Sequence, residues 1–115
     1  FLHHPPFRTG IWHMDNMGLT GAERFADVVR NHPQVERVLC GHLHRPITTS
    51  VAGTVVTVAP GTAHQIELAL GDNHRLAVVM EPPCCLIHAW MPGEGLVTHA
   101  SYIGEYDIPI VLAEN

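Results

Sequence analysis

Hydrophobic and polar positions along this chain first follow the period of a helix and later that of strands. Between residues 22 and 29, apolar side chains recur three and four residues apart, as they do on one face of a helix. Thr20 and Glu23 match a capping box, so we expect the helix to start with Thr20 as its N-cap. It should continue to about Asn31, because Pro33 disfavours helical backbone in the residue before it.

The other segments are mostly short runs of β-branched residues separated by turns. Residues 35–40 become continuously apolar toward their end, which is typical of a buried strand. Further strands are expected over residues 47–51, 54–58, 66–70, 77–80, 86–90 and 95–102, with turns at 52–53 and 92–95. Residues 7–19 show neither period and predict a loop, while Pro109 favours an extended tail over residues 103–115.

These elements predict a mixed fold. A helix followed by a buried strand is typical of an α/β layer, whereas strands that follow one another without helices favour antiparallel pairing. The predicted fold class is therefore α/β, or α+β within the 115 residues of this chain. The chain starts without Met, and Phe1 and Leu2 resemble the end of a strand. We expect the sequence to be the C-terminal part of a longer protein.

The composition narrows the classes of partner. A formal net charge of −5 argues against a nucleic-acid polymer as the main partner. Of the three cysteines, Cys84 and Cys85 are adjacent, which is unsuited to a disulfide framework and favours free thiols in a reducing compartment. We therefore expect a cytoplasmic protein. No apolar run approaches the roughly 20 residues of a membrane span, so no membrane partner is predicted.

Histidines stand where two predicted strands give way to loops. His3 and His4 come directly before two prolines, and His42 and His44 follow the strand over residues 35–40. In an extended segment, residues two apart point the same way, so the rings of His42 and His44 can reach one metal or two neighbouring metals. Imidazole is a common ligand of divalent transition metals. Taken alone, each pair is better explained as polar residues on an ordinary loop.

Three other families with a His-x-His motif do not fit. A metallo-β-lactamase pattern needs Asp and His where this chain has Pro46 and Ile47, and a cupin pattern needs a carboxylate that residues 47–50 lack. A zincin needs His-Glu-x-x-His on a helix, and the chain does not contain it. The histidines without a partner at ligand spacing are expected at the surface or at element ends, namely His13, His32, His74, His88 and His99.

The combined motifs resemble the C-terminal half of the calcineurin-like metallophosphoesterases. They are His-x-Pro-Pro after one strand, a helix, and Gly-His-x-His at residues 41–44 after the next strand. The segment Ala-Pro-Gly-Thr-Ala-His-Gln at residues 59–65, the run at 84–88 and residues 106–115 resemble its cyclic-nucleotide and glycerophosphodiester phosphodiesterase branch. The resemblance implies that residues 1–70 are the C-terminal half of a catalytic β-sandwich flanked by helices. Residues 71–115 would then form a β-rich cap and tail.

The resemblance also implies a site for two divalent metal ions, either Mn, Fe, Zn or Co. By motif position, His3 and His42 would bind one ion and His44 the other. His4 would lie at the pocket edge and His64 near the substrate phosphate, where one of them donates a hydrogen bond or protonates the leaving group. The remaining ligands of the family are an Asp-x-His, a metal-bridging Asp and an Asn-His pair, which lie in its N-terminal half. Asp15, Asp72 and Asp107 of this chain are not expected to supply them. On its own the chain is therefore expected to be inactive.

We predict that the chain is part of a metal-dependent phosphodiesterase. It would hydrolyse a small phosphodiester, of the cyclic-nucleotide or glycerophosphodiester type, by means of a metal-bridging hydroxide. A homo-oligomer through the β-rich C-terminal segment is also expected, because an open sheet edge must be paired or protected. The alternative is a non-catalytic β-rich module that binds a single metal through His42 and His44 or serves in oligomerisation.

Overall fold

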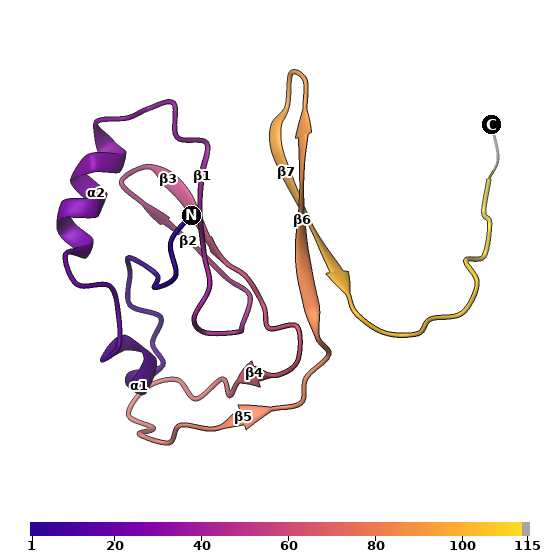
Figure 1. Ribbon diagram of the computed structural model, residues 1–115, viewed down its shortest axis with the longest axis horizontal. Coiled ribbons are helices and arrows are strands. Elements are labelled where there is room, and N and C mark those ends of the chain that lie inside the picture. The colour runs from indigo at the N-terminus through magenta and orange to yellow at the C-terminus, as the bar shows by residue number, and fades with distance from the viewer. Residues whose placement is uncertain (114–115) are drawn as a thin grey trace.

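The computed structural model describes residues 1–113, which form two helices and several small sheets (Figure 1). The elements, in chain order, are α1 (Trp12–Asp15), α2 (Ala22–Arg30), β1 (Arg37–Cys40), β2 (Ile47–Val51), β3 (Thr54–Val58), β4 (Gln65–Ile66), β5 (Val78–Val79), β6 (Cys84–Met91) and β7 (Gly95–Tyr102). The predicted mixture of α and β structure is confirmed. Within residues 1–113, no helix combines the length and the apolar character of a membrane span.

Helix α2 carries the apolar face that the sequence predicts, but it begins differently. Val29 is buried and Ala22, Phe25 and Ala26 are half-buried, so these residues form the side that packs on the core. The predicted capping box is wrong, because the N-cap is Gly21, with a left-handed φ of 84° and no side-chain cap. Glycine adopts that backbone without a steric penalty, so it can turn the chain into the helix.

The central sheet has the strand order β1-β3-β2, with β1 parallel to β3 and β2 antiparallel to β3. The predicted turn at residues 52–53 joins β2 and β3, with both residues left-handed, as tight hairpins require. Leu2 adds a parallel bridge to Cys40 at the outer edge of β1. The sheet and α2 lie side by side (Figure 1). Buried Val38, Val56 and Val58 form the middle of the core.

The predicted loop over residues 7–19 contains the short helix α1, which corrects the sequence interpretation. The Asp15 carboxylate accepts hydrogen bonds from the Thr9 backbone N–H, the Thr9 hydroxyl and the Gly10 N–H, at 2.6, 2.8 and 3.0 Å. Ile11 and Met14 are buried in the core. A helix of four residues is too short to show a 3.6-residue period, so the pattern could not indicate it.

The later strands pair antiparallel, as predicted, but their lengths differ from expectation. Strand β4 covers only Gln65–Ile66 and β5 only Val78–Val79, whereas β6 extends beyond the predicted strand at both ends. Strand β7 has the predicted bounds. The β6–β7 hairpin lies beside the central sheet, and residues 103–113 extend away from it as a tail (Figure 1). The last two residues of the predicted tail lie outside the described residues.

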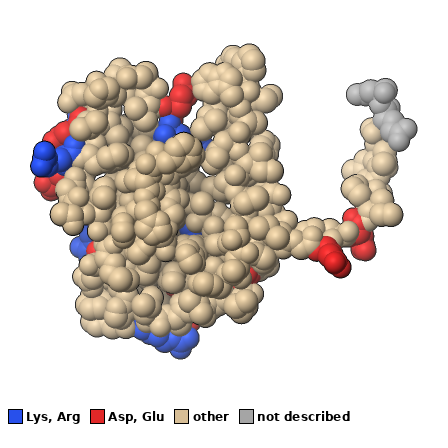
Figure 2. All heavy atoms as spheres, in the orientation of Figure 1, with Lys and Arg blue, Asp and Glu red and all other residues tan. Residues whose placement is uncertain are grey.

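The charged side chains do not form one basic surface on the face that Figure 2 shows. Blue and red atoms lie in small separate groups, and two acidic groups stand on the extended tail. This distribution agrees with the acidic net charge of −5. A basic surface is the electrostatic footprint of a nucleic-acid binding protein, so this face gives no indication of such a partner.

We predict that Val56→Ala destabilises the protein more than Val55→Ala does. Val56 is fully buried in β3, whereas its neighbour Val55 is 38% exposed. Loss of two buried methyl groups should lower the free energy of unfolding by about 1.5–2 kcal/mol. Both variants lose the same β-branched group, so urea denaturation of the two isolates the burial effect. Equal destabilisation of the two variants would show that Val56 is not a core residue.

Candidate metal centre

Two histidine-bearing loops meet because the segments before them run parallel. The Leu2 N–H donates to the Leu39 carbonyl at 3.1 Å, and the Gly41 N–H donates to the His3 carbonyl at 3.0 Å. The carboxyl ends of parallel strands lie at the same edge of a sheet, and ligands bind outside that edge in open α/β sheets. His3 and His42 are therefore delivered to one place from 39 positions apart in the sequence.

His3, His4 and His42 form the first cluster of imidazoles. One ring nitrogen from each lies within 4.8 Å of the others. The shortest approach is 3.3 Å, between Nδ1 of His42 and Nε2 of His3, and the ring centres of His4 and His42 are 4.3 Å apart. The resemblance places His4 only at the pocket edge, but the structure brings it into the same cluster as the other two rings.

His44 turns away to a different neighbour. Its Nδ1 lies 3.1 Å from Nε2 of His64, with the two rings tilted by 56°. His42 and His44 both have left-handed backbone, with φ of 71° and 51°. That conformation is uncommon for residues other than glycine, and it replaces the extended segment that the sequence argument assumes. We call His44 and His64 the 44–64 pair.

Gly61 allows the loop over residues 59–65 to approach His44 closely. A Cβ atom at Gly61 would meet the His64 carbonyl oxygen at 2.0 Å and the His44 Cβ at 2.9 Å. The Gly61 N–H donates to the His44 carbonyl at 2.9 Å. The buried side chain of Gln65 closes the loop, since it accepts from the Gly61 N–H and donates to the Gly61 carbonyl. The sequence motif includes this glycine, but only the structure shows that a side chain at this position would collide with the neighbouring loop.

The surroundings of His42 favour a neutral ring. Burial lowers the pKa of His42, and the nearby charges of His4, His3 and His44 lower that pKa further. A neutral imidazole keeps the lone pair that a metal needs. Burial raises the pKa of the neighbouring Cys40 thiol to about 11. Cys40 is therefore a protonated thiol in the core, and the imidazoles are left as the donors.

The first cluster fits a divalent transition metal. Nε2 of His42 is buried and has no hydrogen-bond partner. Unpaired buried nitrogens are costly, and a metal or a water satisfies them. Two nitrogens bound to one tetrahedral zinc lie about 3.3 Å apart, given Zn–N bonds of about 2.0–2.1 Å. The 3.3 Å between Nδ1 of His42 and Nε2 of His3 agrees with that spacing, so Nδ1 is the His42 nitrogen placed to share an ion with His3, and Nε2 would need a separate partner.

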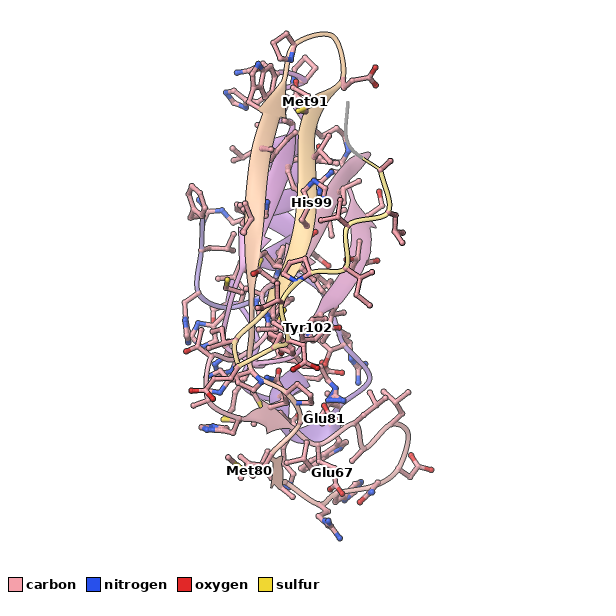
Figure 3. The ribbon with its side chains drawn as sticks, turned by 90° about the vertical axis from the view of Figure 1, so that its right-hand side faces the viewer. Glu67, Met80, Glu81, Met91, His99 and Tyr102 are labelled. Atoms are coloured by element: carbon pink, nitrogen blue, oxygen red, sulfur yellow. The ribbon has the colours of Figure 1, made fainter. Side chains whose placement is uncertain are left out.

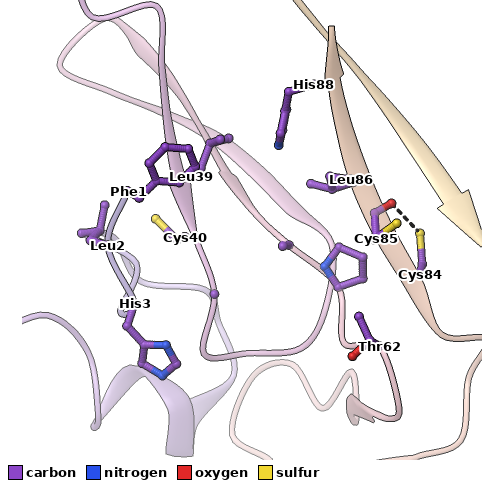
Figure 4. A pocket seen from close by; sticks show the side chains of 13 residues that line it. Phe1, Leu2, His3, Leu39, Cys40, Thr62, Cys84, Cys85, Leu86 and His88 are labelled. Atoms are coloured by element: carbon purple, nitrogen blue, oxygen red, sulfur yellow. Dashed lines mark hydrogen bonds between the residues drawn. The ribbon is translucent and has the colours of Figure 1, made fainter.

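A cleft of about 630 Å³ lies next to this centre, between the start of the chain and the β6–β7 hairpin (Figure 4). Its walls are mainly apolar, with Leu2, Leu39 and Leu86 among the lining residues. His3 is the one member of the first cluster that contributes to its wall. An apolar wall does not satisfy the charge of a phosphate group, so the cleft is not where we place the phosphate.

Two connections at this site were not visible in the sequence pattern. The first is the membership of His4 in the cluster, for which the adjacent Pro5 was a weak signal because it restricts His4 to extended backbone. The second is the bidentate ion pair between Arg45 and Glu81, with hydrogen bonds of 2.7–3.0 Å. These two residues are 36 positions apart, so no local motif contains them both.

The chain is similar in sequence to known phosphodiesterases. No family model matches it. It is 43% identical to a probable glycerophosphodiester phosphodiesterase of Arcobacter nitrofigilis over 95% of the chain and 40% of that protein. It is 30% identical to a glycerophosphodiester phosphodiesterase of Enterobacter lignolyticus over the whole chain and 41% of that protein. A probable cyclic nucleotide phosphodiesterase of Rhodopseudomonas palustris is 32% identical over 96% of the chain and 39% of that protein.

The chain belongs to the calcineurin-like metallophosphoesterases. Its relatives lie in the glycerophosphodiester and cyclic nucleotide phosphodiesterase branch, so the predicted resemblance is confirmed. The chain spans about two fifths of the length of the curated relatives it matches. Divalent metal ions are implied by the family, and among the described residues the first cluster is the group of three donors that fits one.

We predict that His42→Ala abolishes most of the metal binding at the first cluster. Loss of a residue that only hydrogen-bonds to a metal-binding side chain typically lowers metal affinity by roughly 10–100-fold. Loss of the metal-binding side chain itself should therefore lower the affinity by at least about 100-fold. Isothermal titration of the purified protein with Zn²⁺ or Mn²⁺ measures this. The matched control is His99→Ala, which removes an exposed imidazole from β7. Equal affinities for the two variants would exclude His42 as a ligand.

Gly61→Ala should disturb the protein more than Gly104→Ala does. At Gly61 the new methyl group meets backbone, which cannot move without moving His64. At Gly104 it meets only the end of the flexible Tyr106 side chain. We expect a lower melting temperature and weaker metal binding for Gly61→Ala alone. If both variants behave like the wild type, the close approach of the two loops at Gly61 is wrong.

Proposed function

We propose that this chain forms part of the active site of a metal-dependent phosphodiesterase. His3 and His42 would hold one divalent ion, with His4 beside them, and His44 would hold a second. The observation that supports this most directly is the 3.3 Å approach of His42 to His3 at one sheet edge, in a chain related to phosphodiesterases over its whole length. When bound, divalent ions supply Lewis acidity and a nucleophile at neutral pH for hydrolysis of a phosphodiester.

The 44–64 pair gives this chain a ring, His64, that can donate a proton at the site. If Nδ1 of His44 carries the proton and donates it to Nε2 of His64, then Nε2 of His44 keeps a free lone pair for a metal. In the same tautomer, Nδ1 of His64 carries a proton. That N–H can donate a hydrogen bond to a phosphate oxygen. It can also pass its proton to a departing alkoxide while the proton on Nδ1 of His44 moves to Nε2 of His64, so that His64 stays neutral and the negative charge passes to His44, the ring that would hold the metal. His64 is thus our candidate for substrate binding and general acid catalysis.

His4 is the second candidate for substrate contact. Its ring is 4.9 Å from that of His3 and 4.3 Å from that of His42, measured between ring centres. Pro5 is buried directly after it, which keeps the backbone of His4 in place. We propose that His4 either joins the first cluster as a ligand or donates from the edge of the site to the phosphate. Metal titration of His4→Ala separates the two roles.

The substrate class is proposed from the relatives. Their names describe glycerophosphodiester and cyclic nucleotide phosphodiesterases, so we propose a small phosphodiester of one of these types. We further propose that the site is dinuclear and that the chain is the C-terminal part of the complete enzyme, with Mn, Fe, Zn or Co as its metals. Free Cys40, Cys84 and Cys85 support a reducing compartment such as the cytoplasm.

One observation favours the alternative of a non-catalytic module that binds a single metal. In the part of the chain that the structure describes, the one group of three metal donors contains only histidines. A dinuclear site of this type would also need carboxylates. The alternative predicts one ion per chain and no hydrolysis by the whole protein that carries this sequence.

The test is hydrolysis of bis(p-nitrophenyl) phosphate, a glycerophosphodiester and a cyclic nucleotide by that whole protein with Mn²⁺. We expect hydrolysis of at least one of the three, with two ions bound per chain. Loss of activity on treatment with a chelator, and its return with Mn²⁺, would establish the metal requirement. A protein that binds one ion and hydrolyses none of them would establish the alternative instead.

We expect His64→Ala to lower kcat by about 10²–10⁴ for a diester with a poor leaving group. The loss should be much smaller for bis(p-nitrophenyl) phosphate, because p-nitrophenolate leaves without a proton. A steady-state comparison of the two substrates measures the difference, with His99→Ala as the control. An equal loss on both substrates would assign His64 to binding and not to proton transfer.

A homo-oligomer through the β-rich segment also belongs to this proposal. Strands β6 and β7 form a sheet of two strands, so within residues 1–113 each has one edge without a partner strand. Exposed Ile87, Trp90 and Tyr102 add apolar surface along the hairpin. Figure 3 shows the hairpin from the side, with Met91 at one end and Tyr102 toward the other. Sedimentation of the wild type and of Trp90→Asp tests this proposal.

A further inference from the structure

Arg45 directly follows His44 and connects segments from different parts of the chain. Its guanidinium donates to both carboxylate oxygens of Glu81, at 2.7 and 3.0 Å, and its Nη1 also donates to the Ile66 carbonyl at 3.1 Å. The Arg45 side chain is only 12% exposed, whereas that of Glu81 is 48% exposed. A bidentate guanidinium in this setting holds a fixed orientation, which an ammonium group would not.

Arg45 joins the two loops that carry the 44–64 pair. Arg45 is one residue from His44, and Ile66 is two residues from His64, so the guanidinium bridges the two loops that carry these rings. Glu81 stands between β5 and β6, at the opposite end of the hairpin from Met91 (Figure 3). The ion pair therefore links both loops to the segment that leads into the β6–β7 hairpin.

A second set of hydrogen bonds connects the same three segments. The Gly61 carbonyl accepts from the Cys84 N–H at 3.0 Å, while the Gly61 N–H donates to the His44 carbonyl at 2.9 Å. Within residues 1–113, the one side-chain hydrogen bond of either ring in the 44–64 pair is the bond between the two rings. Their relative position is consequently set by the backbones of the two loops, which Arg45 and Gly61 hold together.

We propose that Arg45 is a positioning residue whose ion pair with Glu81 sets the approach of His44 to His64. As far as it concerns catalysis, the role rests on the proposed phosphodiesterase function. Through this ion pair, the position of the segment that leads into the β6–β7 hairpin would affect the positions of His44 and His64. A group behind a ligand typically contributes about 10–100-fold to metal affinity or activity through orientation alone, and this is the range we expect for Arg45.

The first readout does not require metal or activity. Nitrogen-15 NMR of the metal-free protein at mildly alkaline pH reports the tautomer of each histidine ring. In the wild type, His44 and His64 should each show one dominant tautomer because they share a hydrogen bond. Arg45→Gln and Glu81→Gln should shift both rings toward a mixture of tautomers. The control is Arg75→Gln, which breaks an ion pair of 2.7 Å with Glu67 and leaves the Arg45 ion pair in place.

The second readout is metal affinity together with kcat on a phosphodiester. Metal affinity and kcat should fall by about 10–100-fold in Arg45→Gln and by less in Arg45→Lys. In the double variant of Arg45→Gln with Glu81→Gln, they should fall no further than in the worse of the two single variants. Melting temperatures identify any variant that fails to fold, in which case Glu81→Gln and Arg45→Lys carry the test. If the wild type binds no metal and hydrolyses nothing, the phosphodiesterase proposal fails and the tautomers alone decide on Arg45. Unchanged tautomers in both Arg45→Gln and Glu81→Gln would overturn the positioning role.

Discussion

The candidate site depends on the parallel pairing of the first residues of the chain with the end of β1. Two backbone hydrogen bonds make this pairing, one from Leu2 to Leu39 and one from Gly41 to His3. They bring His3 and His42 together before any side chain contributes. Because these bonds belong to the backbone, the meeting of the two rings does not depend on a favourable contact between them. The chain path that places the two rings is therefore set by the backbone.

The β2–β3 hairpin extends the same geometry to the second pair of rings. The chain reverses in the loop between β1 and β2 and again at the hairpin, so β3 runs parallel to β1 and ends at the same edge of the sheet. The Ala59 N–H donates to the Cys40 carbonyl at 2.8 Å, which continues the pairing past the end of the strands. The loop over residues 59–65 thereby starts beside the loop that carries His42 and His44. Three strand ends, with three histidine-bearing loops, meet at one edge.

Local sequence patterns predicted the parts of this fold that local physics determines. The buried face of α2, the turn at residues 52–53 and the bounds of β7 each follow from signals within a few residues. Helix α1 could not be predicted because it is a single turn that hydrogen bonds to Asp15 stabilise. Strands β4 and β5 pair with each other over only two residues, which the longer apolar runs in the sequence do not indicate. The family resemblance singled out His3, His4, His42, His44 and His64, whose roles stay predictions. It could not indicate the left-handed backbone of His42 and His44, which separates their rings into two clusters.

The charge of the donors bears on the dinuclear centre that we propose. The first cluster offers neutral imidazoles, and burial keeps His42 in that form. Two divalent ions a few ångströms apart repel each other strongly in a partly buried site, and neutral rings do not offset that repulsion. A carboxylate between the ions would offset that repulsion. However, the Asp15 carboxylate accepts hydrogen bonds from residues 9 and 10, and the Glu81 carboxylate is paired with Arg45. The imidazole edge described here thus fits one side of the proposed metal centre, in which the negative ligands would come from other residues.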